Sequence, residues 1–128
     1  MLRNLSDEVH PKQYQDEYSA EFVSKWDELI DWEKRHAAED GFFKTTLEAH
    51  GAKSVLDIAC GTGFHAVTLA LDGFDVVGSD GAPTMLAKAK ENAERVGLAD
   101  LELVQAEWTR LTEAFPAKSF DAVVCLGN

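Results

Sequence analysis

Long apolar runs are absent from this 128-residue chain, and their absence limits the class of protein it can be. No run approaches the roughly 20 apolar residues that a membrane-spanning helix needs. Residues 1–13 also lack the apolar stretch of a signal peptide. With 45% hydrophobic and 27% charged residues, the composition is typical of one globular domain with a packed core. We therefore expect a cytoplasmic protein with no membrane partner.

Basic side chains are also scarce. Twelve Lys and Arg residues stand against 23 Asp and Glu residues, which gives a formal net charge of −11. A negative field of this kind repels the phosphates of nucleic acids and of anionic membrane surfaces. Nucleic acid is therefore not an expected partner, and the charge alone says nothing about the chemistry.

Cysteine is rare, and its placement excludes the common metal motifs. Cys60 and Cys125 form no C-x-x-C pair. The histidines share no ligand spacing and stand at His10, His36, His50 and His65. Both cysteines lie in apolar segments, so we expect two buried, reduced thiols and no metal site. His65 is interpreted as a residue of a helix start.

The first third of the chain has helical periodicity. Aromatic residues spaced four apart form one stripe, made of Tyr14, Tyr18, Phe22 and Trp26. The pattern predicts a helix over residues 14–38, a break at Asp40 and Gly41, and a second helix over 42–50 that Gly51 closes. We expect residues 1–50 to form a helical cap.

Short apolar runs alternate with amphipathic stretches after Gly51. The expected strands cover residues 54–59, 74–79, 101–106 and 120–126, and the expected helical stretches cover residues 65–72, 83–96 and 109–114. Such alternation over short connections implies right-handed crossovers and a parallel sheet covered on both faces. Residues 51–128 therefore predict an α/β fold with a Rossmann-like, doubly wound parallel sheet.

The strongest chemical signal is a buried strand that runs into a glycine-rich turn and then a helix, in residues 55–63. Gly61 and Gly63 allow a sharp turn and let the backbone approach a ligand, while the following helix presents free N–H groups. Asp57 lies inside the strand, where a charge is costly unless it has partners. A tight turn with no ligand is the alternative interpretation.

Two further strand ends carry candidate binding residues. Asp80 ends the second strand, where its carboxylate can accept hydrogen bonds from the two hydroxyls of a ribose. Asp80 could instead cap the helix that begins near Pro83. Glu107 and Trp108 follow the third strand and offer an acceptor and an aromatic face to an adenine, although a Trp there is often only part of a core.

The fourth strand ends at Asn128. Ligands of open α/β sheets bind beyond the carboxyl ends of the strands, where the strand order reverses, here between the first and fourth strands. Asn128 would then place its amide where a transferred group meets its acceptor. An asparagine is also common in such turns for conformational reasons alone.

These segments resemble the glycine N-methyltransferases and glycine/sarcosine N-methyltransferases of betaine synthesis. The resemblance begins near Tyr14 and is carried by VLDIACGTG, GFDVVGSD, AEWTRL and FDAVVCLGN. It implies an enzyme that uses S-adenosyl-L-methionine to methylate a small amino acid, namely glycine, sarcosine or dimethylglycine. It also implies a sheet of strand order 3-2-1-4-5-7-6, so we expect this chain to lack the C-terminal half and to be inactive by itself. The oligomeric state stays open, a homo-oligomer included.

The resemblance also implies roles for single residues, in the cap as well as in the sheet. The implied cofactor contacts are Tyr18, Trp26, Arg35, Ala59, Gly61, Gly63, Asp80, Glu107, Trp108 and Leu126, with Asn128 facing the methionine end or the amino acid. Tyr14 is an alternative to Tyr18, one helical turn away. Glu107 stands where the family pattern has asparagine or aspartate. No catalytic residue is predicted, because in-line transfer depends mainly on alignment of the reacting groups.

Two other functions fit parts of the pattern. A nicotinamide-dependent oxidoreductase would also have a glycine turn, and Gly61-x-Gly63-x-x-Ala66 followed by Asp80 matches its loose fingerprint. Asp57 within the strand and the CLGN ending argue against this class. A non-catalytic nucleotide-binding module is the other alternative.

Overall fold

The computed structural model describes residues 19–23, 31–116 and 119–126, and these carry the account that follows. Their sheet has the strand order β3-β2-β1-β4, and every pair of neighbouring strands is parallel. The strands are β1 (Ser54–Asp57), β2 (Asp75–Asp80), β3 (Glu102–Gln105) and β4 (Ala122–Val124). The predicted parallel sheet is confirmed, with β1, β3 and β4 shorter than the runs that indicated them and β2 shifted by one residue.

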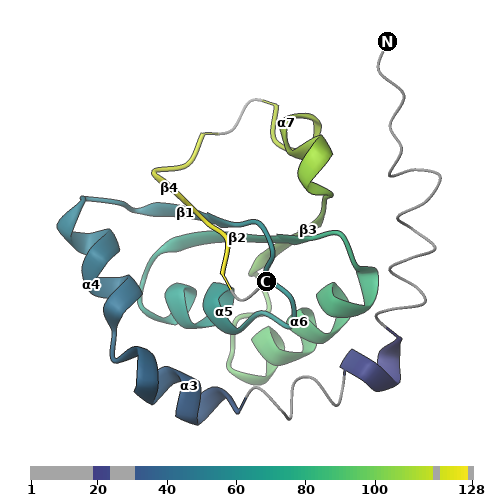
Figure 1. The fold of residues 1–128 in the computed structure, drawn as a ribbon, viewed down its shortest axis with the longest axis horizontal. Helices are drawn as coiled ribbons and strands as arrows, with labels where there is room; N and C mark the ends of the chain where they lie inside the picture. Colours follow the sequence, from purple (N-terminus) through teal and green to yellow (C-terminus); the bar gives the residue numbers. More distant parts are fainter. Residues whose placement is uncertain (1–18, 24–30, 117–118, 127–128) are drawn as a thin grey trace.

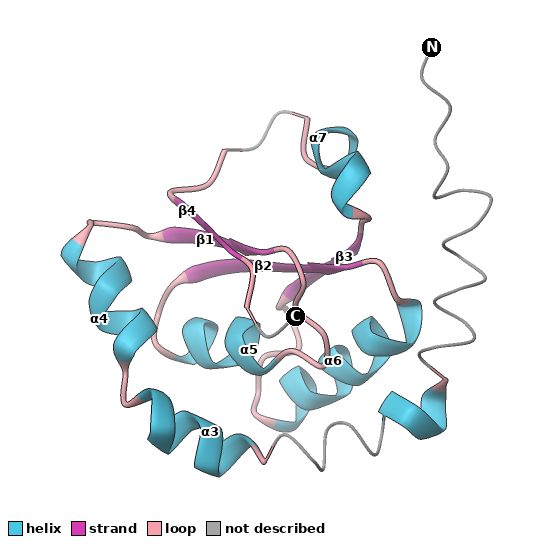
Figure 2. Cartoon of the chain, viewed as in Figure 1, coloured by secondary structure: helices cyan, strands magenta, loops and turns pink. Residues whose placement is uncertain are grey.

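Helices flank this sheet on both sides. They are α3 (Trp32–Glu39), α4 (Phe42–Ala49), α5 (Phe64–Leu71), α6 (Pro83–Arg95), the 3₁₀ turn η2 (Trp108–Arg110) and α7 (Leu111–Ala114). Figures 1 and 2 show α5 and α6 on one side of the sheet and α7 on the other. This arrangement is the doubly wound, Rossmann-like fold that the alternating pattern predicts. No helix within the described ranges is long and apolar enough to cross a membrane.

The strand order reverses at β1, and this reversal positions the candidate site. The chain adds β2 and then β3 on one side of β1, and β4 then pairs with the other side, where Asp57 is in register with Val124. The helix that follows β1, α5, and the short helix that precedes β4, α7, lie on opposite sides of the sheet (Figures 1 and 2). Ligands of such sheets bind at this point.

Small side chains allow the helices to pack closely on the sheet. Val55 in β1 and Ala66 in α5 are completely buried, and Cys60 lies in the same core cluster. A Cβ at Gly78 of β2 would stand 2.8 Å from Cδ2 of Leu103 and 3.3 Å from Sγ of Cys60. Glycine at this position therefore lets the chain after β1 lie directly against β2.

The predicted helix over residues 14–38 is wrong at Asp31, although Tyr14 and part of the aromatic stripe lie outside the described residues. Asp31 has φ 46° and ψ 84°, and its carboxylate accepts the N–H of Lys34 at 3.2 Å. It is therefore the N-cap of α3, a role that aspartate fills because its side chain accepts an unpaired N–H of the first turn. The predicted breaks at Asp40, Gly41 and Gly51 are confirmed by their left-handed backbone.

The two cysteines have different surroundings. Cys60 is buried as predicted, and burial raises the pKa of its thiol well above the usual range. Cys125 is exposed, so the expectation of a buried thiol is wrong there. The reason is that β4 lies at an edge of the described sheet, where Val123 is 58% exposed. The apolar sequence of residues 120–126 is typical of a strand buried on both faces, whereas β4 pairs only with β1 among the described strands.

Candidate functional site

The turn after β1 places two glycines in left-handed conformations with different surroundings. Gly61 has φ 54°, and a Cβ there would meet nothing within 4 Å. Gly63 has φ 95° and is the N-cap of α5, and a Cβ there would lie 3.1 Å from Cβ of Ala89 in α6. Gly61 thus leaves open space beside the turn, whereas Gly63 allows the turn to pack on α6.

Asp80 holds this turn against the end of β2. Its Oδ2 accepts the N–H of Gly61 at 2.9 Å, and its Oδ1 accepts the N–H of Ala82 at 2.9 Å. Burial raises the pKa of Asp80, and these two backbone hydrogen bonds oppose that rise. The N-cap of α6 is Ala82, so Asp80 supports the approach to the helix without being its cap residue. Each carboxylate oxygen can still accept a further hydrogen bond.

Asp57 is a buried acid next to the same turn. Its side chain is 2% exposed, and within the described part of the chain its Oδ1 has no hydrogen-bond partner. Burial raises the pKa of Asp57 to about 7, the Ala59 N–H lowers it, and the negative charge of Asp80 raises it further. A buried carboxylate of this kind is costly unless a donor or a cation reaches it.

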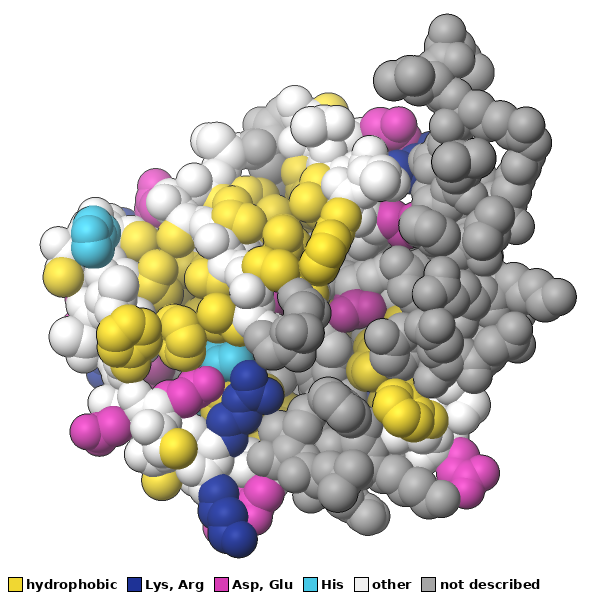
Figure 3. All heavy atoms as spheres, viewed as in Figure 1, with side chains coloured by type: hydrophobic (Ala, Val, Ile, Leu, Met, Phe, Trp, Pro, Cys, Tyr) yellow, Lys and Arg dark blue, Asp and Glu magenta, His cyan; other side chains and the backbone are white. Residues whose placement is uncertain are grey.

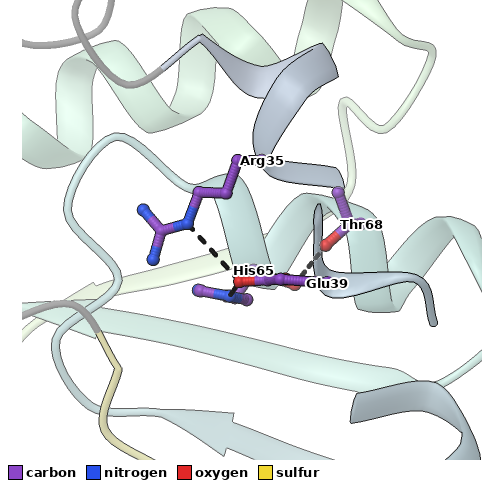
Figure 4. Close-up of polar contacts among 4 residues, drawn as sticks. All are labelled: Arg35, Glu39, His65 and Thr68. Atoms are coloured by element: carbon purple, nitrogen blue, oxygen red, sulfur yellow. Dashed lines mark hydrogen bonds and ion pairs between the residues drawn. The ribbon is translucent and has the colours of Figure 1, made fainter. Parts of the chain in front are cut away.

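The α3 helix brings a cation to this acid. The positive charge of Arg35 lowers the pKa of Asp57, and the Arg35 guanidinium carbon lies 4.9 Å from the ring centre of Phe64, the first residue of α5. Nε of Arg35 lies 3.4 Å from Oε1 of Glu39, and the same oxygen lies 2.7 Å from Nε2 of His65 (Figure 4). The predicted site residue Arg35 is therefore placed beside the glycine turn.

Glu39 was not identified from the sequence, and His65 was interpreted only as a residue of the helix start. That interpretation is confirmed, since His65 is the second residue of α5, and it is also buried, with its ring edge-on to that of Phe43 at 5.2 Å. Burial lowers the pKa of His65, and the Glu39 carboxylate opposes this change. No local pattern indicates a contact between residues 26 positions apart.

The segment after β3 closes the opposite side of the site. Ala106 donates its N–H to the carbonyl of Asp80 at 3.1 Å, and the Trp108 indole donates to the carbonyl of Ile58 at 2.9 Å. Trp108 nevertheless remains 57% exposed, and Glu107 is half-buried. The ends of β1, β2 and β3 are thus tied together, with an aromatic face open to solvent.

Most of the predicted site residues within the described ranges lie on these connections. Ala59, in the turn, and Leu126, after β4, are both half-buried, and Ile58 next to Ala59 donates its N–H to the carbonyl of Val124 at 3.0 Å. The remaining predicted contacts lie outside the described residues: Tyr18, Trp26 and Asn128. Among the described residues, no group of three or more His, Cys, Asp or Glu side chains is placed to hold a metal ion.

Comparisons with known proteins agree with this geometry. Residues 55–128 match the model of a family described as a methyltransferase domain. The chain is 50% identical over 115 residues to a glycine/sarcosine N-methyltransferase of Parasynechococcus marenigrum, covering 90% of this chain and 40% of that protein. It is 51% identical over 115 residues to the glycine/sarcosine N-methyltransferase of Aphanothece halophytica, covering 90% of this chain and 43% of that protein. The chain thus spans less than half the length of these relatives.

A solved structure gives the same picture at the level of the fold. The N-terminal domain of EvdMO1, solved with SAH bound, is 30% identical with a TM-score of 0.56. The alignment covers 64% of this chain and 35% of that one. The resemblance predicted from the glycine turn and the three other segments is confirmed by these similarities.

Proposed function

This chain belongs to the methyltransferase domain family, and from that premise we propose that it forms the S-adenosyl-L-methionine-binding part of an N-methyltransferase. The observation that carries the proposal is the buried, unpartnered carboxylate oxygen of Asp57 beside an open glycine turn. S-adenosylmethionine fits such a site because it carries a sulfonium and an ammonium group, both cations. A pyrophosphate at the same turn would be repelled by the charged form of Asp57. This argues against a nicotinamide cofactor.

Each part of the cofactor has a matching group on the described residues. Asp80 accepts hydrogen bonds from the ribose hydroxyls, and Gly61, with Ala59 and Gly63 in the same turn, leaves room for the backbone to approach. Glu107 and Trp108 offer an acceptor and an aromatic face to the adenine. These roles are part of the proposal.

The amino-acid end of the cofactor is assigned to the cap and to the last strand. The guanidinium of Arg35 suits a carboxylate, which it can bind through two parallel hydrogen bonds. Leu126 lines the pocket, Tyr18 and Trp26 cover the cofactor, and Asn128 faces the methyl acceptor. The last three residues keep their roles from the resemblance alone.

The proposed substrate is glycine or sarcosine, as in the betaine-synthesis enzymes, in a protein of the cytoplasm. When bound, S-adenosylmethionine supplies a methyl group on a sulfonium that is already a good leaving group. The protein therefore needs mainly to hold a neutral amine about 3 Å from that methyl carbon and in line with it, because alignment alone lowers the barrier by several kcal/mol. A carboxylate or solvent takes the proton that the amine loses before attack.

Calorimetric titration tests the cofactor assignment. We expect S-adenosylmethionine and its demethylated product to bind with a stoichiometry of one and NAD not to bind. Binding of NAD alone would contradict the proposal and favour an oxidoreductase. A methylation assay on the full-length polypeptide then separates an enzyme from a nucleotide-binding module, because only the enzyme methylates glycine or sarcosine.

A further inference from the structure

Two helices meet at a single carboxylate oxygen, in a group that we call the Glu39 bridge (Arg35, Glu39 and His65). Oε1 of Glu39 faces Nε of Arg35 at 3.4 Å and Nε2 of His65 at 2.7 Å. A carboxylate only accepts, so Nε2 of His65 carries the proton that it donates. Figure 4 shows these side chains together, with Thr68 donating its hydroxyl to the backbone of His65.

The bridge matters because the described contacts of α3 with α5 converge on one place. None of the residues of α3 is buried. Its contacts with α5 include the Glu39 bridge, the edge-on contact of Trp32 with Phe64 at 5.4 Å, and the Arg35 guanidinium over the Phe64 ring. All of them end on Phe64 or His65, the first two residues after the glycine turn. These contacts therefore hold α3 beside the glycine turn.

The connection after α3 adds to this dependence. Asp40 and Gly41 both have left-handed backbone, with φ 46° and 71°, so α3 and α4 meet at a sharp corner. Such a corner changes the direction of the chain but buries no side chain of α3. A contact close to the corner is well placed to fix the angle of the helix, and Glu39 is the residue just before it.

We propose that Glu39 is a positioning residue, which ties α3 to His65 and thereby holds Arg35 in place to bind the amino-acid end of the cofactor. The contact uses Nε of Arg35, so the two terminal nitrogens of the guanidinium are left for a carboxylate. The proposal rests on the proposed function, since it assigns a role within the same cofactor site. Glu39 itself touches Arg35 and His65 and acts through them.

The test compares two ligands in the full-length polypeptide. S-adenosylmethionine has the amino-acid end, whereas 5′-methylthioadenosine has the same nucleoside without it. We expect Glu39→Ala to weaken binding of S-adenosylmethionine about tenfold, the effect of a lost hydrogen bond to a charged group, and to leave the affinity for methylthioadenosine unchanged. Glu39→Gln should recover part of the loss, because its amide oxygen can still accept from both donors.

The matched control is Glu33→Ala, which removes an exposed glutamate from the same helix and should change neither affinity. In an Arg35→Ala background, Glu39→Ala should have no further effect on S-adenosylmethionine binding, because the group that it positions is gone. Melting temperatures check that the variants are folded.

Three results would overturn the proposal. If Glu39→Ala lowers the affinity for both ligands equally, Glu39 supports only the fold. If it changes neither affinity, the bridge has no role in binding. Either result would leave the proposed function standing, since the parent protein would still bind S-adenosylmethionine. If the parent binds neither ligand, the proposed function fails, and the positioning role fails with it.

Discussion

Asp57 and Asp80 end neighbouring parallel strands, and each side chain is held where a charge is costly. Asp80 has two backbone N–H partners, whereas one oxygen of Asp57 has none among the described residues. The structure therefore separates two roles that the sequence could only place at the same edge of the sheet. Asp80 fixes the shape of the turn, whereas the free oxygen of Asp57 is stabilised only when a hydrogen-bond donor or a cation reaches it.

The raised pKa of Asp57 predicts how the ligand-free chain responds to pH. Asp57 binds its proton more tightly in the folded chain, with a pKa of about 7, than in the unfolded chain, near 3.8. Its favourable contribution is therefore complete below about pH 4 and is lost as the pH rises toward 7, by about 4 kcal/mol at most. We expect Asp57→Asn to remove this part of the pH dependence.

Urea unfolding between pH 5 and pH 8 measures the effect as the difference between variant and parent. Asp75→Asn is the matched control, because Asp75 begins β2 and is exposed at the opposite end of the strand. A parent and an Asp57→Asn variant whose stabilities change in parallel over this range would contradict the prediction.

Asp80→Ala tests the ribose contact. We expect it to weaken S-adenosylmethionine binding by about 1.5–3 kcal/mol, the range for hydrogen bonds to a charged acceptor. Because Asp80 also accepts the N–H groups of Gly61 and Ala82, the melting temperature should fall slightly. Asp75→Ala, at the far end of β2, should leave the affinity unchanged, and equal affinities for Asp80→Ala and the parent would remove the ribose assignment.

The elements themselves were largely predictable. The alternation after Gly51 predicts all of the described strands and their parallel order, because buried strands and amphipathic helices leave different periodicities. The ends of the strands were harder to predict. Apolar residues such as Phe120 and Leu126 lie outside β4, which covers only Ala122–Val124. Apolar character shows that a residue packs, and hydrogen bonding decides whether it belongs to a strand.

Local patterns predicted the candidate site only where its residues lie at strand ends, and Arg35 in α3 came from the family resemblance. Gly61, Asp80 and Trp108 are placed by the connections after β1, β2 and β3, which local patterns reveal. The contact of Glu39 with His65 depends on how α3 folds back over α5. That path is set by the break at Asp31, which the helical periodicity did not show, and by the left-handed pair Asp40 and Gly41 after α3, where the sequence did predict a break.

The glycine turn gives a prediction at the level of an element. Gly61→Ala puts a methyl group into open space at φ 54°, so we expect a stability loss of only about 1 to 2 kcal/mol from backbone strain. The favourable free energy of cofactor binding should fall by more than this stability loss, because the methyl group occupies space that the ligand needs.

Gly51→Ala is the matched control for strain. Gly51 has φ 68° and an equally open Cβ position, but it lies between α4 and the start of β1, at the opposite edge of the sheet. It should cost similar stability and retain most of the binding. A folded Gly61→Ala protein that binds S-adenosylmethionine as tightly as the parent would show that the turn serves only the fold.

Two opposing effects act on the molecule as a whole. A net charge of −11 makes copies of the chain repel one another. Against this, β4 is an edge of the described sheet, and Figure 3 shows apolar side chains gathered over the region of β4. An apolar strand edge offers unpaired backbone groups to another chain. Added salt screens the repulsion and leaves the edge contact, so the balance between the two can be measured.

We therefore predict that the 128-residue polypeptide self-associates through β4, and more strongly as salt is added. Val123→Lys should reduce the association, because a charge at an exposed edge position disfavours strand pairing. Leu71→Lys is the matched control, since Leu71 is 55% exposed on α5 and its replacement makes the same change in charge and a similar loss of apolar surface. Both substitutions make the net charge less negative by one unit and so weaken the repulsion between copies equally. If only Val123→Lys lowers the association, the cause is therefore a contact at the β4 edge. Light scattering across protein and salt concentrations measures the effect, and equal association of the two variants would contradict the role of β4.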